Sequence, residues 1–375
     1  MLFKEVIGQD RIRQQLIQTV KNNRISHAQM FLGPEGSGNL ALAIAYAQYI
    51  NCKNPTDEDS CNVCSSCLKY KKLAHPDLHF VFPVNTSTQV SKNAKSDDYI
   101  KSWREMVLNN PYFTENQWYQ AMGVGNKQGI IGRDESYEII RKLSYKSFEG
   151  KYKTVILWLP ERMNAAAANK LLKQLEEPSS DTVFLFVSQD ADSLLPTIVS
   201  RMQTIKIPRL EPREIQEGLV QIQGVENDEA ARLSKIANGS WVNALELLYP
   251  DEEKQLNFDL FVRMMSLCYQ AELIKMQEWV EEVAPLGREK QKNFLSYALQ
   301  LIRNNLMLNQ KLPKVAHLNK EEYSFSEKFN PFINERNIFD IYDEFNRAHA
   351  HIESNGYAKL VFFDLSLKLM WLLKR

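Results

Sequence analysis

The chain has 375 residues, with 46 Lys and Arg against 46 Asp and Glu, and 44% of its residues are hydrophobic. This length suffices for two or three domains with separate cores. The balanced charge provides no global positive field of the kind that drives autonomous binding to nucleic acid. The N-terminus has no signal-peptide pattern, and the longest apolar stretch, residues 360–373, is interrupted by charges and too short to span a bilayer. We therefore expect a soluble cytoplasmic protein with no membrane partner.

Helix and strand patterns alternate from residue 1 to about 208, which favours an α/β domain with a largely parallel sheet. A segment rich in Ala, Leu, Lys and Glu predicts a helix over residues 165–177, ended by Pro178. The predicted strands are residues 29–32, 78–83, 155–159, 183–188 and 203–207.

A glycine-rich loop lies between a short apolar run and a helix-like run, in the strand, loop and helix setting of a phosphate-binding loop. A working loop follows its last Gly with Lys, which reaches the phosphates, and then with Ser or Thr, which holds Mg²⁺. Here those positions hold Asn39, which carries no positive charge, and Leu40, which offers no oxygen to a metal. We expect Gly33, Gly36 and Gly38 to keep the shape of the loop without productive binding of ATP or Mg²⁺. An isolated pattern of this kind is also typical of a tight turn, and the flanking segments favour the loop.

A second nucleotide motif is also altered. An NTPase of this type needs acids at the end of another strand, where they hold Mg²⁺ and orient the attacking water. The best candidate strand, residues 154–157, is followed by Trp158 and Leu159. Two altered motifs in one chain argue against ATP hydrolysis by the chain itself.

Four of the five cysteines form a cluster, Cys52, Cys61, Cys64 and Cys67, separated by eight, two and two residues. Four thiolates satisfy tetrahedral Zn²⁺ and close the site, which is the structural rather than the catalytic arrangement. The polar loop between them, residues 54–60, lacks the hydrophobicity to fold alone, and one zinc ion would supply the missing stability. In the cytoplasm such cysteines are metal ligands more often than disulfides. Unpaired buried thiols, an iron–sulfur site and a redox switch remain as alternatives.

Residues 84–130 do not fit the alternation of helices and strands. Aromatic residues amid polar ones can stack on nucleic-acid bases, or they can pack into a small subdomain. The sequence assigns no role to this insert. Its aromatic residues include Trp103, Tyr112, Phe113, Trp118 and Tyr119.

Beyond Pro208 and Pro212 almost every segment has helical periodicity, with a small unit to about residue 250 and a longer one over residues 251–375. Cys268 stands alone among apolar residues, which indicates a core position. The apolar residues near the C-terminus suit an internal core and a subunit interface equally. They are Phe362, Phe363, Leu365, Leu369, Trp371 and Leu372.

Taken together, these segments resemble the delta-prime subunits of bacterial DNA polymerase III clamp loaders, a branch of the AAA+ family. The likeness covers most of the first 250 residues and is weak beyond them, and the insert at 84–130 departs from the family pattern. Besides the glycine loop and the cysteines, it is carried by Val6-Ile7-Gly8-Gln9, Arg24-Ile25-Ser26-His27-Ala28, His75-Pro76-Asp77, Ile139-Ile140-Arg141, residues 166–178 and Ser200-Arg201-Met202. Met202 stands where the family usually has Cys.

The resemblance implies a three-part fold. Residues 1–208 would form an AAA+ α/β domain, similar to P-loop NTPases, with a zinc-binding insertion at 52–67. Residues 209–250 would form a small helical lid domain, and residues 251–375 an all-α collar that assembles with other subunits.

The resemblance also assigns a role to Arg201. It implies an arginine finger, presented in trans to ATP bound by a neighbouring subunit, whose guanidinium stabilises the charge of the transferred phosphate. The pattern around Arg201 alone is more typical of an ordinary surface or ion-paired arginine. Motor relatives carry a sensing Arg where this chain has Val242, which would be a third missing nucleotide contact.

The implied function is that of a non-catalytic delta-prime subunit within a complex that has DNA-directed DNA polymerase activity. Its partners would be the gamma/tau ATPase subunits and the delta subunit, with the sliding clamp and primed DNA reached through the complex. Two alternatives remain: a divergent, active ATPase subunit of the gamma/tau type, and a zinc-dependent nucleic-acid-binding module.

Overall fold

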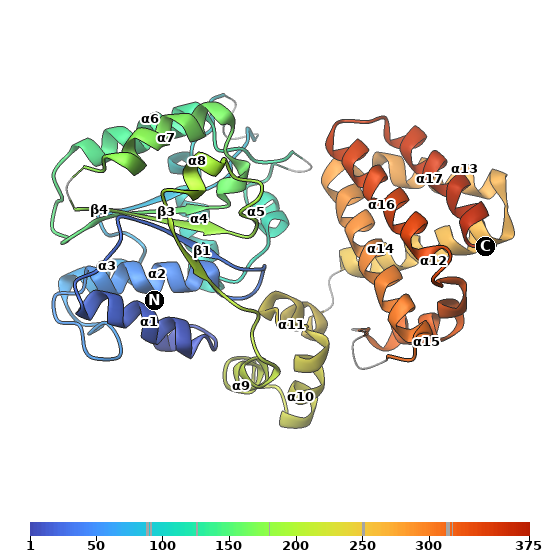
Figure 1. Ribbon diagram of the computed structural model, residues 1–375, viewed down its shortest axis with the longest axis horizontal. Coiled ribbons are helices and arrows are strands. Elements are labelled where there is room, and N and C mark those ends of the chain that lie inside the picture. Colours follow the sequence, from blue (N-terminus) through green and yellow to red (C-terminus); the bar gives the residue numbers. More distant parts are fainter. Residues whose placement is uncertain are drawn as a thin grey trace. The chain divides into compact units, whose positions relative to one another are not determined.

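The computed structural model describes residues 1–87, 90, 92–124, 127–179, 181–249, 252–312, 316 and 318–375. These residues form two compact units, 1–244 and 245–375. The first unit contains the sheet, the insert and most of the segment expected as a lid, and the second unit is helical (Figure 1).

Within the described residues, one sheet has the strand order β2-β3-β4-β1-β5, and every pair of neighbours is parallel. This confirms the predicted parallel α/β architecture, and each strand overlaps its predicted range. The strands are β1 (Ala28–Leu32), β2 (Leu78–Val81), β3 (Lys153–Trp158), β4 (Thr182–Ser188) and β5 (Gln203–Lys206).

Helices cover both faces of the sheet (Figure 1). Side chains alternate along β1: Met30 joins the core beneath α6 and α7, whereas the amide of Gln29 lies 3.3 Å from the Tyr46 hydroxyl on α2. One layer contains α1 (Asp10–Lys21), α2 (Asn39–Ile50) and α3 (Ser65–Tyr70), and the other contains α6 (Arg133–Ser144), α7 (Ala165–Glu176) and α8 (Pro196–Val199). The helix predicted over 165–177 is therefore confirmed as α7.

Helix α2 is buried along its whole length. An all-apolar helix surface needs cover on every side, and here the sheet covers one side while α1, α3 and the N-terminal segment η1 (Phe3–Glu5) cover the other. Phe3 packs on Tyr49 with their ring centres 5.5 Å apart. The glycine loop before α2 is thus attached to a rigid element.

The insert folds into η2 (Ser96–Tyr99), α4 (Ile100–Asn109) and α5 (Glu115–Ala121) around an aromatic core. Trp103 and Trp118 are fully buried, and Trp103 stacks on Phe82 with ring centres 4.2 Å apart. The packed subdomain is therefore the correct alternative, because these rings have no face free for a base.

The segment after β5 forms α9 (Pro212–Gln223), α10 (Asn227–Ile236) and α11 (Trp241–Leu248). Pro212 is the first residue of α9, where its missing N–H costs no hydrogen bond. Gly224 ends the same helix with a φ of 68°, which a residue with a Cβ rarely adopts. Gly218 lies so close to Trp241 that a Cβ would meet its ring at 2.8 Å, so α9 and α11 pack tightly.

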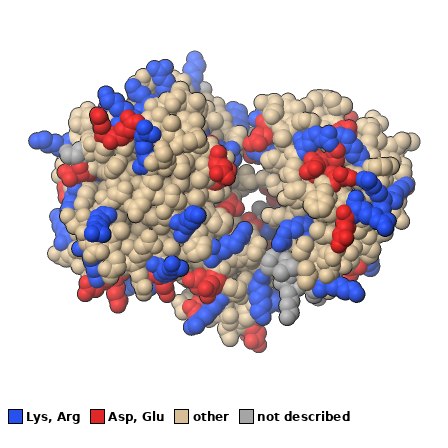
Figure 2. Space-filling model, in the orientation of Figure 1, with Lys and Arg blue, Asp and Glu red and all other residues tan. Residues whose placement is uncertain are grey.

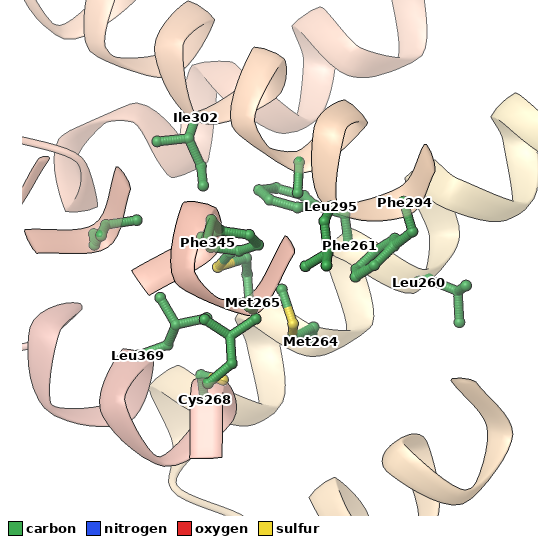
Figure 3. Close-up of a cluster of buried hydrophobic side chains, with 14 of the residues drawn as sticks. Leu260, Phe261, Met264, Met265, Cys268, Phe294, Leu295, Ile302, Phe345 and Leu369 are labelled. Carbon is green, nitrogen blue, oxygen red and sulfur yellow. The ribbon is translucent and has the colours of Figure 1, made fainter. Parts of the chain in front are cut away.

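The second unit is built from helices that surround one hydrophobic core (Figure 3). Cys268 is fully buried in this core, as predicted, and burial raises the pKa of its thiol to about 12. The main helices are α12 (Glu252–Gln270), α13 (Leu273–Val283), α14 (Arg288–Asn309), α15 (Lys320–Phe329), α16 (Ile338–Glu353) and α17 (Ala358–Leu372), with the short turns η4 (Ala284–Leu286) and η6 (Asn330–Phe332).

The apolar residues of the last helix, which suited either an internal core or a subunit interface, lie on different faces of that helix. Phe362, Leu365, Leu369 and Leu372 are buried in the core, whereas Trp371 is 65% exposed.

No helix in the described ranges has the length and apolar character needed to cross a membrane. On the face shown in Figure 2, basic and acidic side chains are interspersed.

A buried carboxyl attaches the insert to the sheet domain. Glu135, at the start of α6, accepts a hydrogen bond from the Ser96 amide at 2.7 Å, and the Ser96 hydroxyl donates to the Phe82 carbonyl at 3.2 Å. Burial raises the pKa of Glu135 from 4.5 to about 7.

Glu135 therefore makes stability depend on pH. Below 4.5 the carboxyl is neutral in both the folded and unfolded chain. As the pH rises from 4.5 to about 7 the unfolded chain loses this proton first, so the free energy of unfolding falls. Glu135→Gln keeps an acceptor for Ser96 and cannot ionise. We expect it to stabilise the chain at about pH 8 by up to about 3 kcal/mol, at about 1.4 kcal/mol per pKa unit, with little effect at about pH 4.

Urea unfolding of the full chain at the two pH values, followed by tryptophan fluorescence, measures this difference. Glu138→Gln on the same helix is the control of opposite sign, because hydrogen bonds from Lys95 and Arg141 lower the pKa of Glu138. An equal effect of Glu135→Gln at both pH values would contradict the expectation.

Candidate functional site

The glycine loop connects the carboxyl end of β1 to α2. Gly36 and Gly38 have φ values of 79° and 95°, in the region that favours glycine. The Trp241 amide, at the start of α11, donates to the Gly36 carbonyl at 3.0 Å, and a Cβ on Gly36 would collide with Ser240. At Gly33 a Cβ would collide with the carbonyl of Ile207. Gly33 and Gly36 are thus packed closely against the segments that follow β5, and Gly38 lies against Tyr112 of the insert.

Asn39 turns its side chain into the loop. Its amide nitrogen donates to the carbonyls of Gly33 at 2.6 Å and Ser188 at 3.3 Å, and its oxygen accepts from the Ser37 hydroxyl. Asn39 is only 7% exposed, and the neighbouring Leu40 is 4% exposed. Asn39 therefore joins the loop to the end of β4, and both residues are occupied inside the fold.

The residues at the other two altered motifs, Trp158 and Leu159 at the end of β3 and Val242 in α11, are also part of the core. Trp158 ends β3 and is buried, with its ring centre 5.1 Å from that of Phe113. Leu159 and Val242 are buried as well. Glu161 is an acid near the end of β3 that the sequence reasoning did not single out. Its Oε1 accepts from the Ser188 hydroxyl and two following backbone amides at 2.6–2.8 Å, so it shapes the turn after β4.

The space above the loop is small. A cavity of about 30 Å³ remains, lined by Gly36, Gly38, Asn39, Tyr112 and Trp158 among others. Small-molecule sites have volumes of roughly 300–1,000 Å³. Pro111, Tyr112 and Phe113 of the insert line this cavity, and no pattern in the sequence predicted that they would lie here.

The four clustered cysteines lie together, as predicted. Their sulfur atoms are all within 4.8 Å of one another, and the Sγ atoms of Cys61 and Cys67 are 3.9 Å apart. A tetrahedron with Zn–S bonds of about 2.3 Å has edges of about 3.8 Å. The four thiols are therefore spaced as ligands of one metal ion, and such an ion would crosslink the loop after α2 to α3.

Backbone amides surround these sulfur atoms. The amides of Cys61, Cys64 and Cys67 point at the sulfur atoms of the preceding cysteines, at 3.3–3.4 Å. Hydrogen bonds, the largest from the Val63 amide, lower the pKa of Cys61 to about 6, whereas burial raises the pKa of Cys52 and of Cys67. Donors of this kind stabilise thiolate, which is the form that binds a metal. The donor set is all sulfur, which suits Zn²⁺ or an iron–sulfur centre, and the closed arrangement favours a structural zinc ion.

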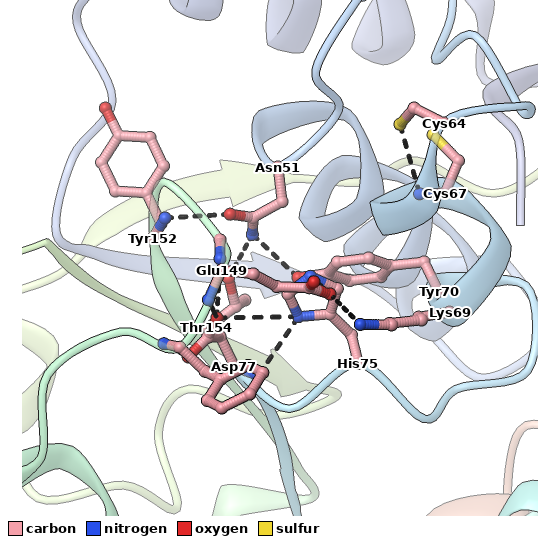
Figure 4. A network of polar contacts seen from close by, with 12 residues as sticks. Asn51, Cys64, Cys67, Lys69, Tyr70, His75, Asp77, Glu149, Tyr152 and Thr154 are labelled. Atoms are coloured by element: carbon pink, nitrogen blue, oxygen red, sulfur yellow. Dashed lines mark hydrogen bonds and ion pairs between the residues drawn. The ribbon is translucent and has the colours of Figure 1, made fainter.

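A buried polar network joins the cysteine module to the sheet (Figure 4). Asp77 accepts from the amides of Phe148, Glu149 and Gly150 at 2.6–2.9 Å. Burial acts to raise the pKa of Asp77, but these amides hold it below its ordinary value. The amide of Asn51 donates to the Tyr70 hydroxyl on α3 at 2.8 Å. The network fixes both ends of the module to the start of β3.

The same network explains part of the motif His75-Pro76-Asp77. The Nδ1 atom of His75 accepts from the Asp77 amide at 3.1 Å, and its Nε2 lies 3.3 Å from the Glu149 carboxylate, which also pairs with Lys69 at 2.6 Å. Desolvation by burial lowers the pKa of His75. The sequence marked this motif only by resemblance, and its local role is structural.

Arg201 lies in the turn between α8 and β5. Its guanidinium donates to the Thr197 carbonyl at 2.7 Å and pairs with Glu176 at the end of α7. The side chain of Arg201 is 34% exposed. Both contacts hold the charge at the surface, and neither covers it fully.

The parallel sheet separates Arg201 from the glycine loop. Arg201 precedes β5 and so lies at the end of the sheet where the strands begin, called here the amino-terminal edge. The loop follows β1 and lies at the opposite, carboxyl edge, where the strands end. Strands β1 and β5 pair from Gln203 to Lys206, which alone separates the edges by about 10 Å at about 3.3 Å per residue. Arg201 and the glycine loop therefore lie at opposite ends of the paired strands.

The sequence model of the family "DNA polymerase III, delta subunit" matches residues 8–211, which is more than half of the chain. The chain therefore belongs to this DNA polymerase III delta subunit family.

Individual relatives come from several bacteria. DNA polymerase III subunit delta' of Bacillus subtilis is 29% identical over 244 residues, covering 65% of this chain and 60% of that protein. Subunit delta' of Pseudomonas aeruginosa is 30% identical over 190 residues, covering 50% and 45%. Subunit tau/gamma of Haemophilus influenzae is 24% identical over 348 residues, covering 87% and 44%. The chain thus spans 60% or less of the length of these relatives.

Among solved structures, a DNA polymerase III gamma subunit-related protein of Thermotoga maritima aligns with 98% of this chain and 100% of that chain. The two are 16% identical, and the TM-score is 0.36. The family assignment therefore rests on the sequence matches.

The cysteine geometry predicts one zinc ion per chain. We expect Cys67→Ser to reduce the zinc content several-fold and to lower the unfolding temperature, because a buried ligand of the metal is lost. Metal content by mass spectrometry and thermal unfolding of the full chain measure both effects.

Cys268→Ser is the matched control, because it removes the cysteine outside the cluster. It should keep the zinc content of the unchanged chain even if the loss of a core thiol lowers stability. Iron in place of zinc, or equal zinc in all three proteins, would contradict the assignment.

Proposed function

We propose that this family member is the delta-prime subunit of a DNA polymerase III clamp loader. It would be a non-catalytic subunit that presents Arg201 in trans to ATP held by a neighbouring gamma/tau-type subunit. Through that assembly, which would also contain the delta subunit, it would take part in loading the sliding clamp onto primed DNA.

The opposite positions of Arg201 and the glycine loop carry this proposal. An arginine at the far edge of the sheet from its own loop can serve only a nucleotide bound elsewhere. If subunits were arranged in a ring, with the arginine of each subunit facing the loop of the next, every such arginine would lie beside a nucleotide bound by a neighbour. The subunit at the end of such an array would have to present its arginine, but it would not have to bind a nucleotide in its own loop.

The surroundings of Arg201 suit recognition of phosphate. A planar guanidinium can exchange one carboxylate for phosphate oxygens of similar spacing. Glu176 and the Thr197 carbonyl orient the guanidinium in the free chain. A neighbouring γ-phosphate would replace Glu176 as the anionic partner, while the Thr197 contact keeps the side chain in place.

The altered loop supports the non-catalytic part of the proposal. Asn39 carries no charge and uses its amide inside the loop, and the end of β3 contributes Trp158 to the core instead of an acid. The similarity to tau/gamma subunits keeps an active ATPase as the rival. Tight ATP binding by the isolated chain would favour that rival.

A nucleic-acid-binding module is the weaker alternative. Its aromatic residues are buried in the insert, and the numbers of basic and acidic residues are equal. Salt-sensitive DNA binding by the chain alone would favour it.

Replacement of Arg201 tests the proposal. In a loader reconstituted from the same organism, we expect Arg201→Ala to lower the ATPase rate stimulated by clamp and primed DNA by about tenfold or more. Arginine fingers of small GTPases contribute about 10³ to 10⁵, and a smaller share is expected here. Arg201→Lys should recover little, because an ammonium group cannot make the paired contacts.

Arg213→Ala is the control, since Arg213 is exposed and pairs only locally with Glu217 at 2.8 Å. Size-exclusion chromatography must show that all variants assemble. An unchanged ATPase rate in an assembled Arg201→Ala loader would leave the chain without the active role proposed here.

A further inference from the structure

The tip of the insert, residues 110–113, lies directly over the glycine loop. Asn110 and Tyr112 hold each other around Pro111, because the Asn110 amide donates to the Tyr112 carbonyl at 2.9 Å and the Tyr112 amide donates back at 3.0 Å. Thr114 then caps α5 by accepting from the Gln117 amide at 3.1 Å. The tip is therefore a short, closed turn between two helices.

Tyr112 contacts three parts of the first unit. Its hydroxyl accepts a hydrogen bond from the backbone amide of Ile7 at 2.8 Å. Its ring lies 3.3 Å from the position of a Cβ on Gly38, and its ring centre is 6.3 Å from that of Trp241 on α11. One side chain thus meets the N-terminal segment, the glycine loop and the first turn of α11.

The tip is anchored on its other side as well. Phe113 packs edge-on against Trp103, with ring centres 5.4 Å apart. Glu115 forms a paired ion contact with Arg162, just after β3, at 2.7 and 2.8 Å. The indole of Trp118 donates to the Pro83 carbonyl at 2.8 Å, beyond the end of β2. These contacts tie the insert to the carboxyl edge of the sheet, where the loop lies.

We propose that residues 110–113 are a built-in occupant of the pocket above the glycine loop, with Tyr112 in the place of a bound nucleotide. The tip joins the N-terminal segment, the loop and α11 into one arrangement that needs no ligand. A mobile nucleotide would have to displace a buried ring and break the hydrogen bond to Ile7 before it could enter.

Other contacts connect the same parts, namely the N-terminal segment, the glycine loop and the segments after β5, which together are called the joint. The side-chain amide of Gln9 donates to the carbonyls of Ser37 at 3.0 Å and Pro208 at 2.7 Å, and the Gln9 backbone amide donates to Glu214 on α9 at 2.9 Å. The glycine loop, the linker after β5 and α9 are thereby connected by protein groups alone. The position of α9–α11 against the loop then stays constant whether or not ATP is present.

Hydrogen exchange in the full chain tests the role of Tyr112. Tyr112→Phe removes only the acceptor of the Ile7 amide and keeps the ring. We expect the exchange rate over residues 5–9 to rise about tenfold or more, because a buried amide loses its partner. Tyr99→Phe, in the same insert, removes a hydroxyl that donates to the Asn85 carbonyl at 2.8 Å and should leave residues 5–9 unchanged.

Tyr112→Ala tests the joint itself. With zinc content and helical content retained, exchange should rise over residues 5–9, 36–40 and 241–244 together and stay unchanged in the second unit. Millimolar Mg-ATP should not alter exchange in the unchanged chain. Unaltered exchange over residues 5–9 in Tyr112→Phe, or protection of the glycine loop of the unchanged chain by ATP, would overturn the proposal. None of these measurements involves Arg201 or a partner subunit, so they are independent of the proposed function.

Discussion

The common direction of the strands is the constraint on which the first unit depends. Because all neighbouring strands among the described residues run parallel, the segments that leave the strands lie at one end of the sheet and the segments that enter them lie at the other. The glycine loop and the end of β3 share the first edge, and Arg201 lies at the second. The insert can therefore cover the edge that carries the glycine loop, while Arg201 at the other edge stays partly exposed.

At the closed edge the altered residues depend on one another. Asn39 turns inward and completes the loop, Trp158 offers a ring where an acid would need water and metal, and the tip of the insert packs on that ring through Phe113. A buried carboxylate at the position of Trp158 would be costly without a cation beside it. An aromatic core at the end of β3 is thus physically compatible with the absence of an acid at that position.

The cysteine module shows how a polar segment can belong to the same rigid body. Its loop carries few apolar groups, so its order rests on the four thiols and on the buried network around Asp77 and Asn51. The network gives hydrogen-bond partners to buried polar side chains such as Asp77 and Asn51. The module, the N-terminal segment and the insert each cover part of α2 or of the loop that precedes it.

The sequence by itself determined the parallel α/β class, the approximate strand ranges, helix α7 and the cysteine cluster. These are local properties, since periodicity, glycine spacing and residue chemistry act within a few residues. Only the tertiary structure decided that Tyr112 lies over Gly38, that Arg201 pairs with Glu176 and that Trp371 is exposed while Leu369 is buried. Such contacts join residues tens of positions apart, and no local pattern encodes which of several aromatic or charged residues will meet. The packing of the whole chain makes that choice, because only there do shape, burial and hydrogen bonding have to be satisfied together.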